Sequence, residues 1–306
     1  IYDLKQDSKK SYWLATNSGL IKYDGYNFRY IDNPEMTSNS LFNLCVDKED
    51  NVYCNNLSGQ IFKITKDSCS LHYQIPDSLM NREITINIDE EGDLIVVTNQ
   101  LFYIDSNKKA RLIDSEQGKG LLGGLLHNPF RSPQEDKLDH PQYGHYVFNY
   151  VNKKVFRLQQ KKLTYVVTLH EMVKPNLFDY QNDLLMIDIN SEKDVYQNGQ
   201  LIEQEFQSEK KERKVFQDGE YFWFVQLTGG VKIVDRQKNQ YDTAPVVFSN
   251  RFISAFLKDQ EGNIILGTFG DGLIVIPNMN AASYSLVDNN DRPTKIVNAG
   301  NHGLIV

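Results

Sequence analysis

Short apolar runs of four to six residues alternate with polar turns along nearly the whole chain. Their length and spacing are typical of β-strands, which are about 5–6 residues long and are bounded by Gly, Asn and Asp turns. One stretch shows four such runs in succession: Leu41–Val46, Val52–Asn55, Ile61–Ile64 and Ser70–Ile75. No long apolar pattern with the helical period of about 3.6 is present, so the chain is predicted to be all-β.

The runs recur as a repeat that combines an acidic turn, an apolar strand and a glycine turn. In the first unit, Asp7 is followed six residues later by Trp13, and then by Thr16 and Gly19. The same order returns along the chain, and the large apolar position falls at Trp13, Tyr53, Ile95, about residue 148, Leu185, Trp223 and Ile265. Successive large apolar positions are separated by roughly 40 residues, except for one longer gap before residue 148. The sequence therefore contains seven repeats.

Four antiparallel strands in each repeat predict a β-propeller. A single four-stranded sheet cannot bury both of its faces, whereas sheets packed radially around an axis bury each face against a neighbour. The predicted fold is all-β, a seven-bladed β-propeller of four-stranded antiparallel blades. We expect Trp13, Tyr53 and Trp223 to fill the space between blades. We also expect the leading Asp of each turn to accept hydrogen bonds from turn amides.

Two segments depart from the repeat. Residues 114–144 are rich in Gly, Pro and His, and we interpret them as a loop insertion between regular units. Residues 295–306 look like the opening of another unit. The predicted organisation is therefore a propeller over 1–294 and the beginning of a further repeat or second propeller over 295–306. The chain starts at Ile1 without a Met, so we expect it to be a piece of a longer protein.

Composition agrees with this fold and excludes some functions. The chain contains 17 Tyr and 16 Phe, which favour the pleated, half-buried surfaces of sheets. Basic residues number 33 and acidic residues 40, a net charge of −7, whereas a protein that binds nucleic acid through phosphates normally carries the opposite balance. We therefore expect no nucleic acid partner. No apolar stretch reaches the roughly 18–20 residues that a membrane helix requires.

The three cysteines, Cys45, Cys54 and Cys69, contain no Cys-x-x-Cys pair and predict neither a zinc site nor a disulfide framework. A regular hairpin over 47–52 would place Cys45 opposite Cys54. A disulfide between these two is one alternative in an oxidising compartment. Two buried thiols are the alternative that we favour.

Two of the repeats resemble a known family. The runs Trp13-Leu-Ala-Thr-Asn-Ser-Gly-Leu-Ile-Lys-Tyr-Asp-Gly-Tyr-Asn-Phe28 and Gly262-Asn-Ile-Ile-Leu-Gly-Thr-Phe-Gly-Asp-Gly-Leu273 resemble the two-component regulator propeller repeat. The resemblance implies the periplasmic sensor region of a hybrid two-component system of the Bacteroidetes type. In that family two propellers and a small β-sandwich precede a membrane helix, and a histidine kinase lies on the cytoplasmic side.

The same resemblance implies the ligand, the partner domains and the oligomeric state of the module. It implies an oligosaccharide ligand, a second propeller and downstream signalling domains of the same chain, and a homodimer in the full-length receptor. The module itself is then not an enzyme, because the kinase lies elsewhere in the full-length chain.

The expected binding face of a propeller carries the turns between second and third strands and the loops between blades. Side chains at these positions offer hydrogen-bonding groups and one aromatic ring, and the candidate ligand-binding residues are Asn39, Arg82, Asn99, Asn250, Arg251, Phe269 and Asp271. Such groups suit a sugar, because amides and charged groups pair with hydroxyls and a ring lies under the apolar face of a pyranose. The insertion is expected to reach the same face, where Phe130 or Tyr143 could supply a ring.

Two groups of residues could in principle bind a metal ion, and we predict that neither does. Three histidines in or beside the insertion are interpreted as exposed loop residues, since they lie on an irregular Pro-containing segment: His127, His140 and His145. The turns that begin at Asp47, Asp89 and Asp259 lack the terminal bidentate Glu of a calcium loop, and we interpret them as hairpin turns.

No catalytic motif is visible. The chain has no nucleophile elbow, phosphate loop or zinc-protease motif, so no catalytic residue, cofactor or metal is predicted. Two alternative functions stay open. A propeller-fold glycan hydrolase or lyase would place two carboxylates roughly 5–10 Å apart in the central funnel. A protein-interaction scaffold would expose an apolar patch on one face.

Overall fold

The computed structural model of the chain describes residues 1–66, 68–80, 84–89, 91–113, 125–126, 145–149, 152, 154–168, 175–180, 183–188, 195–197, 200–202, 212–219, 221–235, 243–277, 297–298 and 304–305. The regular elements in this part of the chain are β-strands, apart from one turn of 3₁₀ helix, η1 (Asp77–Leu79). No helix among these residues is long and apolar enough to cross a membrane.

Six four-stranded antiparallel sheets, here called blades 1 to 6, follow one another along the chain. Blades 1 to 3 consist of β1 (Asp3–Gln6), β2 (Tyr12–Thr16), β3 (Gly19–Tyr23), β4 (Phe28–Ile31), β5 (Leu41–Val46), β6 (Val52–Asn56), β7 (Gln60–Thr65), β8 (Ser68–Gln74), β9 (Thr85–Ile88), β10 (Leu94–Val97), β11 (Leu101–Ile104) and β12 (Ala110–Leu112). Blades 4 to 6 consist of β13 (Leu125–Leu126), β14 (His145–Asn149), β15 (Lys154–Gln159), β16 (Lys162–Thr168), β17 (Pro175–Tyr180), β18 (Asp183–Asp188), β19 (Val195–Gln197), β20 (Gln200–Ile202), β21 (Glu212–Asp218), β22 (Tyr221–Gln226), β23 (Val231–Asp235) and β24 (Val246–Val247).

Two smaller sheets complete the described strands. Sheet 7 has three strands, β25 (Ile253–Lys258), β26 (Ile264–Thr268) and β27 (Leu273–Ile276). A separate two-stranded sheet pairs β28 (Val297–Asn298) with β29 (Leu304–Ile305). The assignment of 295–306 to a further repeat stays a prediction, because two short paired strands are compatible with many folds.

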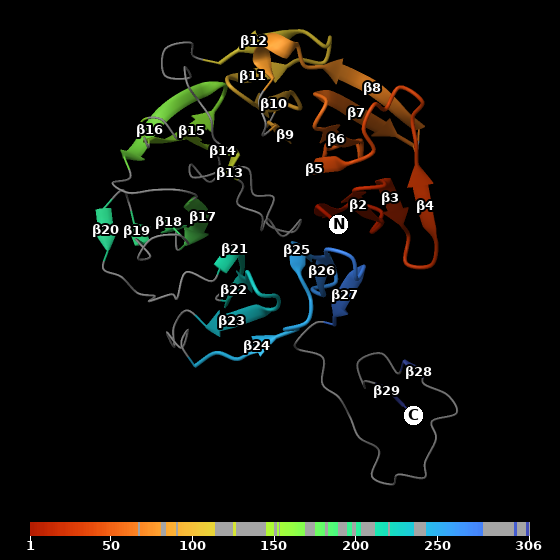
Figure 1. The fold of residues 1–306 in the computed structure, drawn as a ribbon, viewed down its shortest axis with the longest axis vertical. Coiled ribbons are helices and arrows are strands. Elements are labelled where there is room, and N and C mark those ends of the chain that lie inside the picture. The colour runs from red at the N-terminus through yellow and green to blue at the C-terminus, as the bar shows by residue number, and fades with distance from the viewer. Residues whose placement is uncertain are drawn as a thin grey trace.

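Blades 1 to 6 and sheet 7 are arranged around a common axis, with their first strands on the inside (Figure 1). First strands of consecutive sheets contact one another: β1 contacts β5 and β25, β5 contacts β9, β9 contacts β13, and β17 contacts β21. The fourth strands β4, β8 and β16 lie on the outside of the ring. This arrangement confirms the predicted β-propeller of four-stranded antiparallel blades.

The predicted number of blades is wrong. Seven four-stranded blades were expected and six are found, because sheet 7 contains three strands within the part of the chain that the structure describes. The sequence count relied on the large apolar position of each second strand, and β26 supplies that position in sheet 7. A second strand carries no information about whether the outermost strand of the same repeat is paired.

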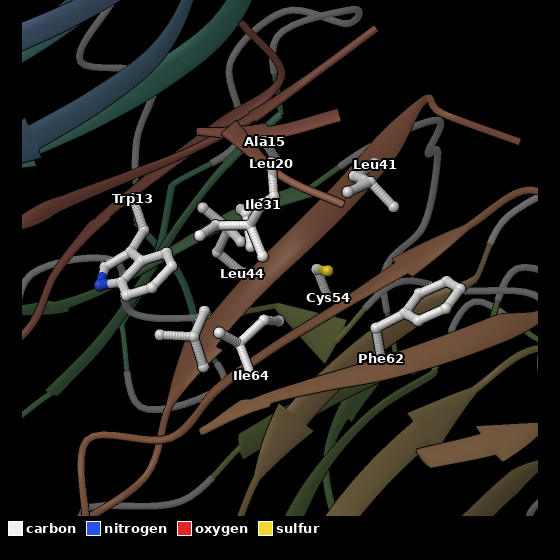
Figure 2. Close-up of a cluster of buried hydrophobic side chains, with 10 residues drawn as sticks. Trp13, Ala15, Leu20, Ile31, Leu41, Leu44, Cys54, Phe62 and Ile64 are labelled. Carbon is white, nitrogen blue, oxygen red and sulfur yellow. The ribbon is translucent and has the colours of Figure 1, made fainter. Parts of the chain in front are cut away.

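The large apolar position of each repeat packs against the next sheet. Trp13 of β2 is 3% exposed and lies in a core cluster with Leu44 and Ile64 of blade 2 (Figure 2). Trp223 of β22 meets Phe256 of sheet 7 edge-on, with ring centroids 5.1 Å apart. These contacts confirm that the repeated tryptophans fill the space between sheets.

The ring closes between sheet 7 and blade 1 by the same kind of contact. Ile265 of β26 packs with Leu4 and Leu14 of blade 1 in one apolar cluster. Polar contacts reinforce this interface, since the Tyr12 hydroxyl donates to Asp259 at 2.7 Å. Burial of both faces of a sheet is the main stabilising effect in such a ring.

The Asp that begins each turn between first and second strands holds that turn by hydrogen bonds. Asp47 Oδ1 accepts hydrogen bonds from the backbone amides of Glu49, at 2.9 Å, and Asn51, at 2.8 Å. Asp89 and Asp259 accept the equivalent pair of amides in their own turns. The expectation that the leading Asp accepts turn amides is confirmed, and these segments are hairpin turns.

Blades 1 and 6 differ in how the buried tryptophan is paired. In blade 1, Trp13 Nε1 donates to Asp7 Oδ2 at 2.9 Å. In blade 6, Gln217 stands in the place of the aspartate, and its amide donates to the Gly219 carbonyl at 3.1 Å. Within the described part of the chain, Trp223 Nε1 has no hydrogen-bond partner. An unsatisfied buried donor of this kind costs about 1–3 kcal/mol.

The β5–β6 hairpin corrects the predicted register of the cysteines. The turn closes between Val46 and Val52, so Cys45 pairs with Tyr53 rather than with Cys54. A shift of one residue turns a side chain to the other face of a sheet. Cys45 accordingly packs between blades 2 and 3, and Cys54 packs between blades 1 and 2. Both are free buried thiols, as favoured from the sequence, and burial raises the pKa of each.

The segment expected as an insertion between units interrupts blade 4 instead. Leu125–Leu126 forms β13, the first strand of that blade, and pairs with β14. Residues 127–144 lie outside the described residues, so the expectation that they reach the binding face stays a prediction. A two-residue strand in a Gly-rich stretch leaves no periodic signal, which explains the error. Four of the predicted loop residues lie outside the described residues: Phe130, Tyr143, His127 and His140. His145, which was expected on a loop, is the first residue of β14.

Lys161, in the turn between β15 and β16 of blade 4, contacts three carboxylates of blade 3. Its Nζ lies 2.5 Å from Asp93 and 3.8 Å from Asp89, and it also pairs with Glu91. The same ammonium lies 4.4 Å from the ring centroid of Tyr103. Burial alone would lower the pKa of Lys161, but the hydrogen bonds with Asp93 and Glu91 outweigh it and raise the pKa above its ordinary value. Lys161 thus supplies the positive charge that this acidic turn requires.

The substitution Trp13→Phe should lower the free energy of unfolding by about 1–3 kcal/mol more than Trp223→Phe. Both changes remove the same atoms from a core between sheets, but only the first leaves a buried Asp7 oxygen without its donor. Urea unfolding of the two variants at pH 7 measures the difference. Equal losses would show that the Asp7–Trp13 hydrogen bond does not stabilise blade 1.

The substitution Lys161→Met should lower the free energy of unfolding by about 1–3 kcal/mol, because three neighbouring carboxylates lose their counter-charge. The loss should shrink in 1 M salt, at a Debye length of about 3 Å, because salt screens the remaining repulsion. Lys162→Met is the matched control, since Lys162 is exposed and forms no ion pair with a described residue. Urea midpoints that are the same for both variants would contradict the role given to Lys161.

Candidate functional site

Two kinds of connection reach the face on which the sequence predicts a binding site. Each first strand begins at this face and each second strand ends there, because the strands are antiparallel. We call it the loop face. Its described turns are 17–18, 57–59, 98–100, 227–230 and 269–272, and its described loops between sheets are 32–40, 75–80 and 248–252.

Three aromatic rings from different sheets meet near the axis at the loop face. Tyr2 stands directly before β1, Phe42 is the second residue of β5, and Phe269 follows β26. Tyr2 stacks on Phe42 with ring centroids 4.6 Å apart and planes inclined by 26°. Phe269 meets Tyr2 edge-on, with centroids 6.0 Å apart. We call these three residues the aromatic row, and each of them is partly exposed.

Beside the aromatic row, sheet 7 and the loop before it carry a charge pair. Arg251 Nη1 lies 2.5 Å from Asp271 Oδ1, and the two side chains are 48% and 36% exposed. The Phe269 amide donates to the Phe252 carbonyl at 2.9 Å, which holds the two segments side by side. The pair can therefore offer both donors and acceptors next to the aromatic row.

The turn that carries Phe269 and Asp271 is built by the Thr and Gly of the repeat. The Thr268 hydroxyl donates to the Gly272 carbonyl at 2.8 Å and accepts from the Asp271 amide at 3.0 Å. In blade 1, Thr16 makes the equivalent bond at 2.8 Å to the carbonyl of its own glycine. The repeat thus fixes the turn, and the residues between Thr and Gly are free to carry a binding function.

The loop before sheet 7 is held by a glycine turn of blade 6. Gly229 and Gly230 have φ angles of +101° and +84°, a region that other residues rarely adopt. The Gly230 amide donates to the Arg251 carbonyl at 2.7 Å. A Cβ on Gly230 would lie 2.7 Å from the Val247 carbonyl oxygen, so the loop passes directly over this turn. The backbone of Arg251 is therefore fixed independently of its side chain.

The loop face is acidic where the structure describes it. Among the described residues of its turns and loops, Arg251 is the one that carries a positive charge. The negatively charged residues there are Asp32, Glu35, Asp77 and Asp271. Arg251 is paired with Asp271, so the described residues of these turns and loops offer no unpaired cationic side chain to a ligand.

Four of the seven predicted ligand-binding residues lie at sheet 7 or in the loop before it, and the other three do not. Arg251, Phe269 and Asp271 come together at sheet 7, and Asn250 lies in the same loop, where its Oδ1 accepts from Ser249 at 3.1 Å. The remaining three do not join them. Asn39 is exposed in the loop between blades 1 and 2, Asn99 uses its amide to bind the Met80 carbonyl at 2.8 Å, and Arg82 lies outside the described residues.

Sequence reasoning missed two members of the aromatic row, Tyr2 and Phe42. The candidates were drawn from turns and loops, whereas Phe42 belongs to a strand and Tyr2 precedes one. The available signal was an aromatic residue at the start of a first strand, the strand that lies nearest the axis. An aromatic residue at that position indicates a binding site only once it is known which strand of each blade lies innermost.

Acidic groups suited to a metal ion lie on the opposite face. Asp89, Glu91 and Asp93 bring their carboxylates within 4.8 Å of one another. Lys161 already occupies this group with its ammonium. We therefore assign these residues to the contact between blades 3 and 4.

One histidine side chain is described, and it lies on an outermost strand. His72 of β8 meets Tyr53 edge-on at 5.5 Å. Burial, together with the charges of Lys108 and Lys63, lowers the pKa of His72 to about 4. The imidazole is therefore neutral at pH 7, and it belongs to blade 2 rather than to the aromatic row.

Comparison with known proteins supports the fold. No family model and no curated protein sequence matches the chain. Among solved structures, the extracellular domain of BT4673 from B. thetaiotaomicron, described as a one-component or hybrid two-component system, is 20% identical with a TM-score of 0.62. The match covers 100% of this chain and 43% of that one.

Two further structures are similar. The extracellular domain of BT3049 from B. thetaiotaomicron, described as a hybrid two-component system, is 16% identical with a TM-score of 0.64, over 91% of this chain and 40% of that one. Virginiamycin B lyase from Staphylococcus aureus is 13% identical with a TM-score of 0.68, over 89% of this chain and 92% of its own. At these identities the likeness establishes a β-propeller. The chain spans less than half the length of the two B. thetaiotaomicron domains.

The substitution Gly230→Ala should destabilise the protein by about 1–3 kcal/mol more than Gly270→Ala. Both glycines have positive φ, at +84° and +104°, but only a Cβ on Gly230 would meet neighbouring atoms within 4 Å. Urea unfolding measures the two losses, and limited proteolysis of 248–252 reports the displaced loop. Equal losses with equal cleavage would contradict the crossing of this loop over the glycine turn.

Proposed function

We propose that the chain is the ligand-sensing propeller of an extracytoplasmic two-component receptor and that it responds to an oligosaccharide. The observation that carries the proposal is the match of the entire chain to the fold of the BT4673 extracellular domain. The repeats at Trp13–Phe28 and Gly262–Leu273 support it independently, because they resemble the regulator propeller motif.

The rest of the receptor belongs to the same proposal. A second propeller would account for the larger length of the BT4673 and BT3049 extracellular domains, and downstream signalling domains would follow it in the same chain. Both B. thetaiotaomicron structures are named as extracellular domains, which favours a periplasmic location for this chain. The histidine kinase would then lie elsewhere in the full-length protein, which would act as a homodimer.

Sensing requires that the ligand bind one signalling state more tightly than another. The close packing of Trp13 and Trp223 between sheets favours rigid blades, since such cores do not deform continuously. A ligand would therefore act at the loop face or at the contact of the propeller with a neighbouring domain.

A propeller-fold lyase is the second candidate. It is favoured by the match to virginiamycin B lyase over nearly the full length of both chains. A lyase would require a general base beside the scissile bond. At the loop face, two carboxylates lie close to the aromatic row in sequence. Asp3 directly follows Tyr2 and accepts a hydrogen bond from the Leu44 amide at 2.7 Å, and Asp271 lies two residues after Phe269 and pairs with Arg251.

Calorimetric titration of the purified 306-residue chain tests both candidates. The panel contains neutral gluco-, manno-, xylo- and galacto-oligosaccharides, together with anionic oligogalacturonides and sulfated disaccharides. We expect saturable binding of at least one saccharide, with the saccharide recovered unchanged by chromatography. Cleavage of the bound saccharide would favour the enzyme, and the absence of binding by every member would contradict saccharide sensing.

A further inference from the structure

We infer that the aromatic row and the Arg251–Asp271 pair together form a binding site for an uncharged, pyranose-containing saccharide. This site rests on the proposed function: it locates saccharide binding at the loop face and restricts the ligand to uncharged saccharides. It joins residues from blade 2, blade 1 and sheet 7, so the site exists only when the ring is assembled.

The aromatic row has the chemistry and the rigidity that a sugar ring requires. The Tyr2 ring contacts Phe42 at 4.6 Å and Phe269 at 6.0 Å, and all three side chains are partly exposed, so their orientation is set before any ligand arrives. Pre-set contact groups cost less ordering entropy on binding. Phe252, which is 48% exposed, lies beside Phe269 and extends the apolar surface toward the charge pair.

The charge pair has the chemistry that sugar hydroxyls require. The guanidinium of Arg251 has donors beyond the one engaged with Asp271, and the carboxylate of Asp271 has further acceptor sites. One hydroxyl of a sugar can therefore accept a hydrogen bond from Arg251 while a neighbouring hydroxyl donates a hydrogen bond to Asp271. Both backbones are held, by Gly230 and Thr268 respectively, so these groups stand at a fixed distance from Phe269.

The charges of the residues that the structure describes on this face favour an uncharged ligand. Arg251 is neutralised by Asp271 at 2.5 Å, and the other charged residues described on the loop face are acidic. A uronic acid or sulfate would meet net negative charge and would have to displace Asp271 from Arg251. Like-charge contacts of this kind oppose binding of the wrong partner.

Two ring substitutions test the site. Phe269→Leu and Phe42→Leu keep an apolar side chain for packing and remove the ring, and each should weaken binding of the neutral saccharide about tenfold. Tyr26→Ala is the matched control, because Tyr26 is 91% exposed in a turn on the opposite face, and it should bind like the unmodified chain. Thermal unfolding confirms that each variant is folded before titration.

One charge substitution tests the ligand class. Asp271→Asn frees Arg251, so it should raise the affinity for an oligogalacturonide relative to that for the neutral saccharide by about tenfold. The unmodified chain should prefer the neutral saccharide. Preference for the anionic saccharide in the unmodified chain would overturn the ligand class.

The remaining outcomes separate this inference from the proposed function. Saccharide binding that is unchanged in folded Phe269→Leu and Phe42→Leu would overturn the site while leaving saccharide sensing intact. Failure of the unmodified chain to bind any saccharide of the panel would overturn both.

Discussion

The sheets whose side chains are described have two apolar faces, and the ring is held together by the need to bury both of them. The repeat meets it by placing one large apolar side chain per second strand against the next sheet, as Trp13 does against blade 2. The Asp that precedes this position closes the adjoining turn and, in blade 1, also pairs with the indole. Packing and turn geometry are thus encoded together within six residues, which explains why the spacing repeats so faithfully along the chain.

A ring held in this way leaves its loop face available for binding. The Thr and Gly of the repeat fix the turn after the second strand, and the residues between them can change without loss of the fold. Residues far apart in the sequence are brought together because neighbouring sheets pack around the axis, and Tyr2 thereby contacts both Phe42 and Phe269. Binding loops carried by a rigid frame are a general solution for recognition.

Local chemistry explains what could be predicted from the sequence. The β-propeller, the strands of blade 2, the tryptophans between sheets and the Asp-capped turns all follow from motifs within one repeat. Arg251, Phe269 and Asp271 were predicted because they occupy a turn and a loop whose positions the repeat defines. The errors involve geometry that no single repeat encodes. Cys45 faces away from Cys54 because the turn closes one residue earlier than a regular hairpin would, and the short strand β13 lies within a stretch that has no periodic pattern. Tyr2 and Phe42 could not be recognised, since their contact depends on the order of strands around the axis.

The central claim is that this propeller binds a saccharide at one end of its axis, on rings contributed by three sheets. Hydrogen exchange measured by mass spectrometry, with and without a saturating neutral oligosaccharide, tests it most directly. Binding at the loop face should slow the exchange of the amides in 248–252 and 269–272 and leave it unchanged in the turns at 7–11 and 47–51 on the opposite face. Slowing confined to those opposite turns, or spread evenly over all blades, would contradict it.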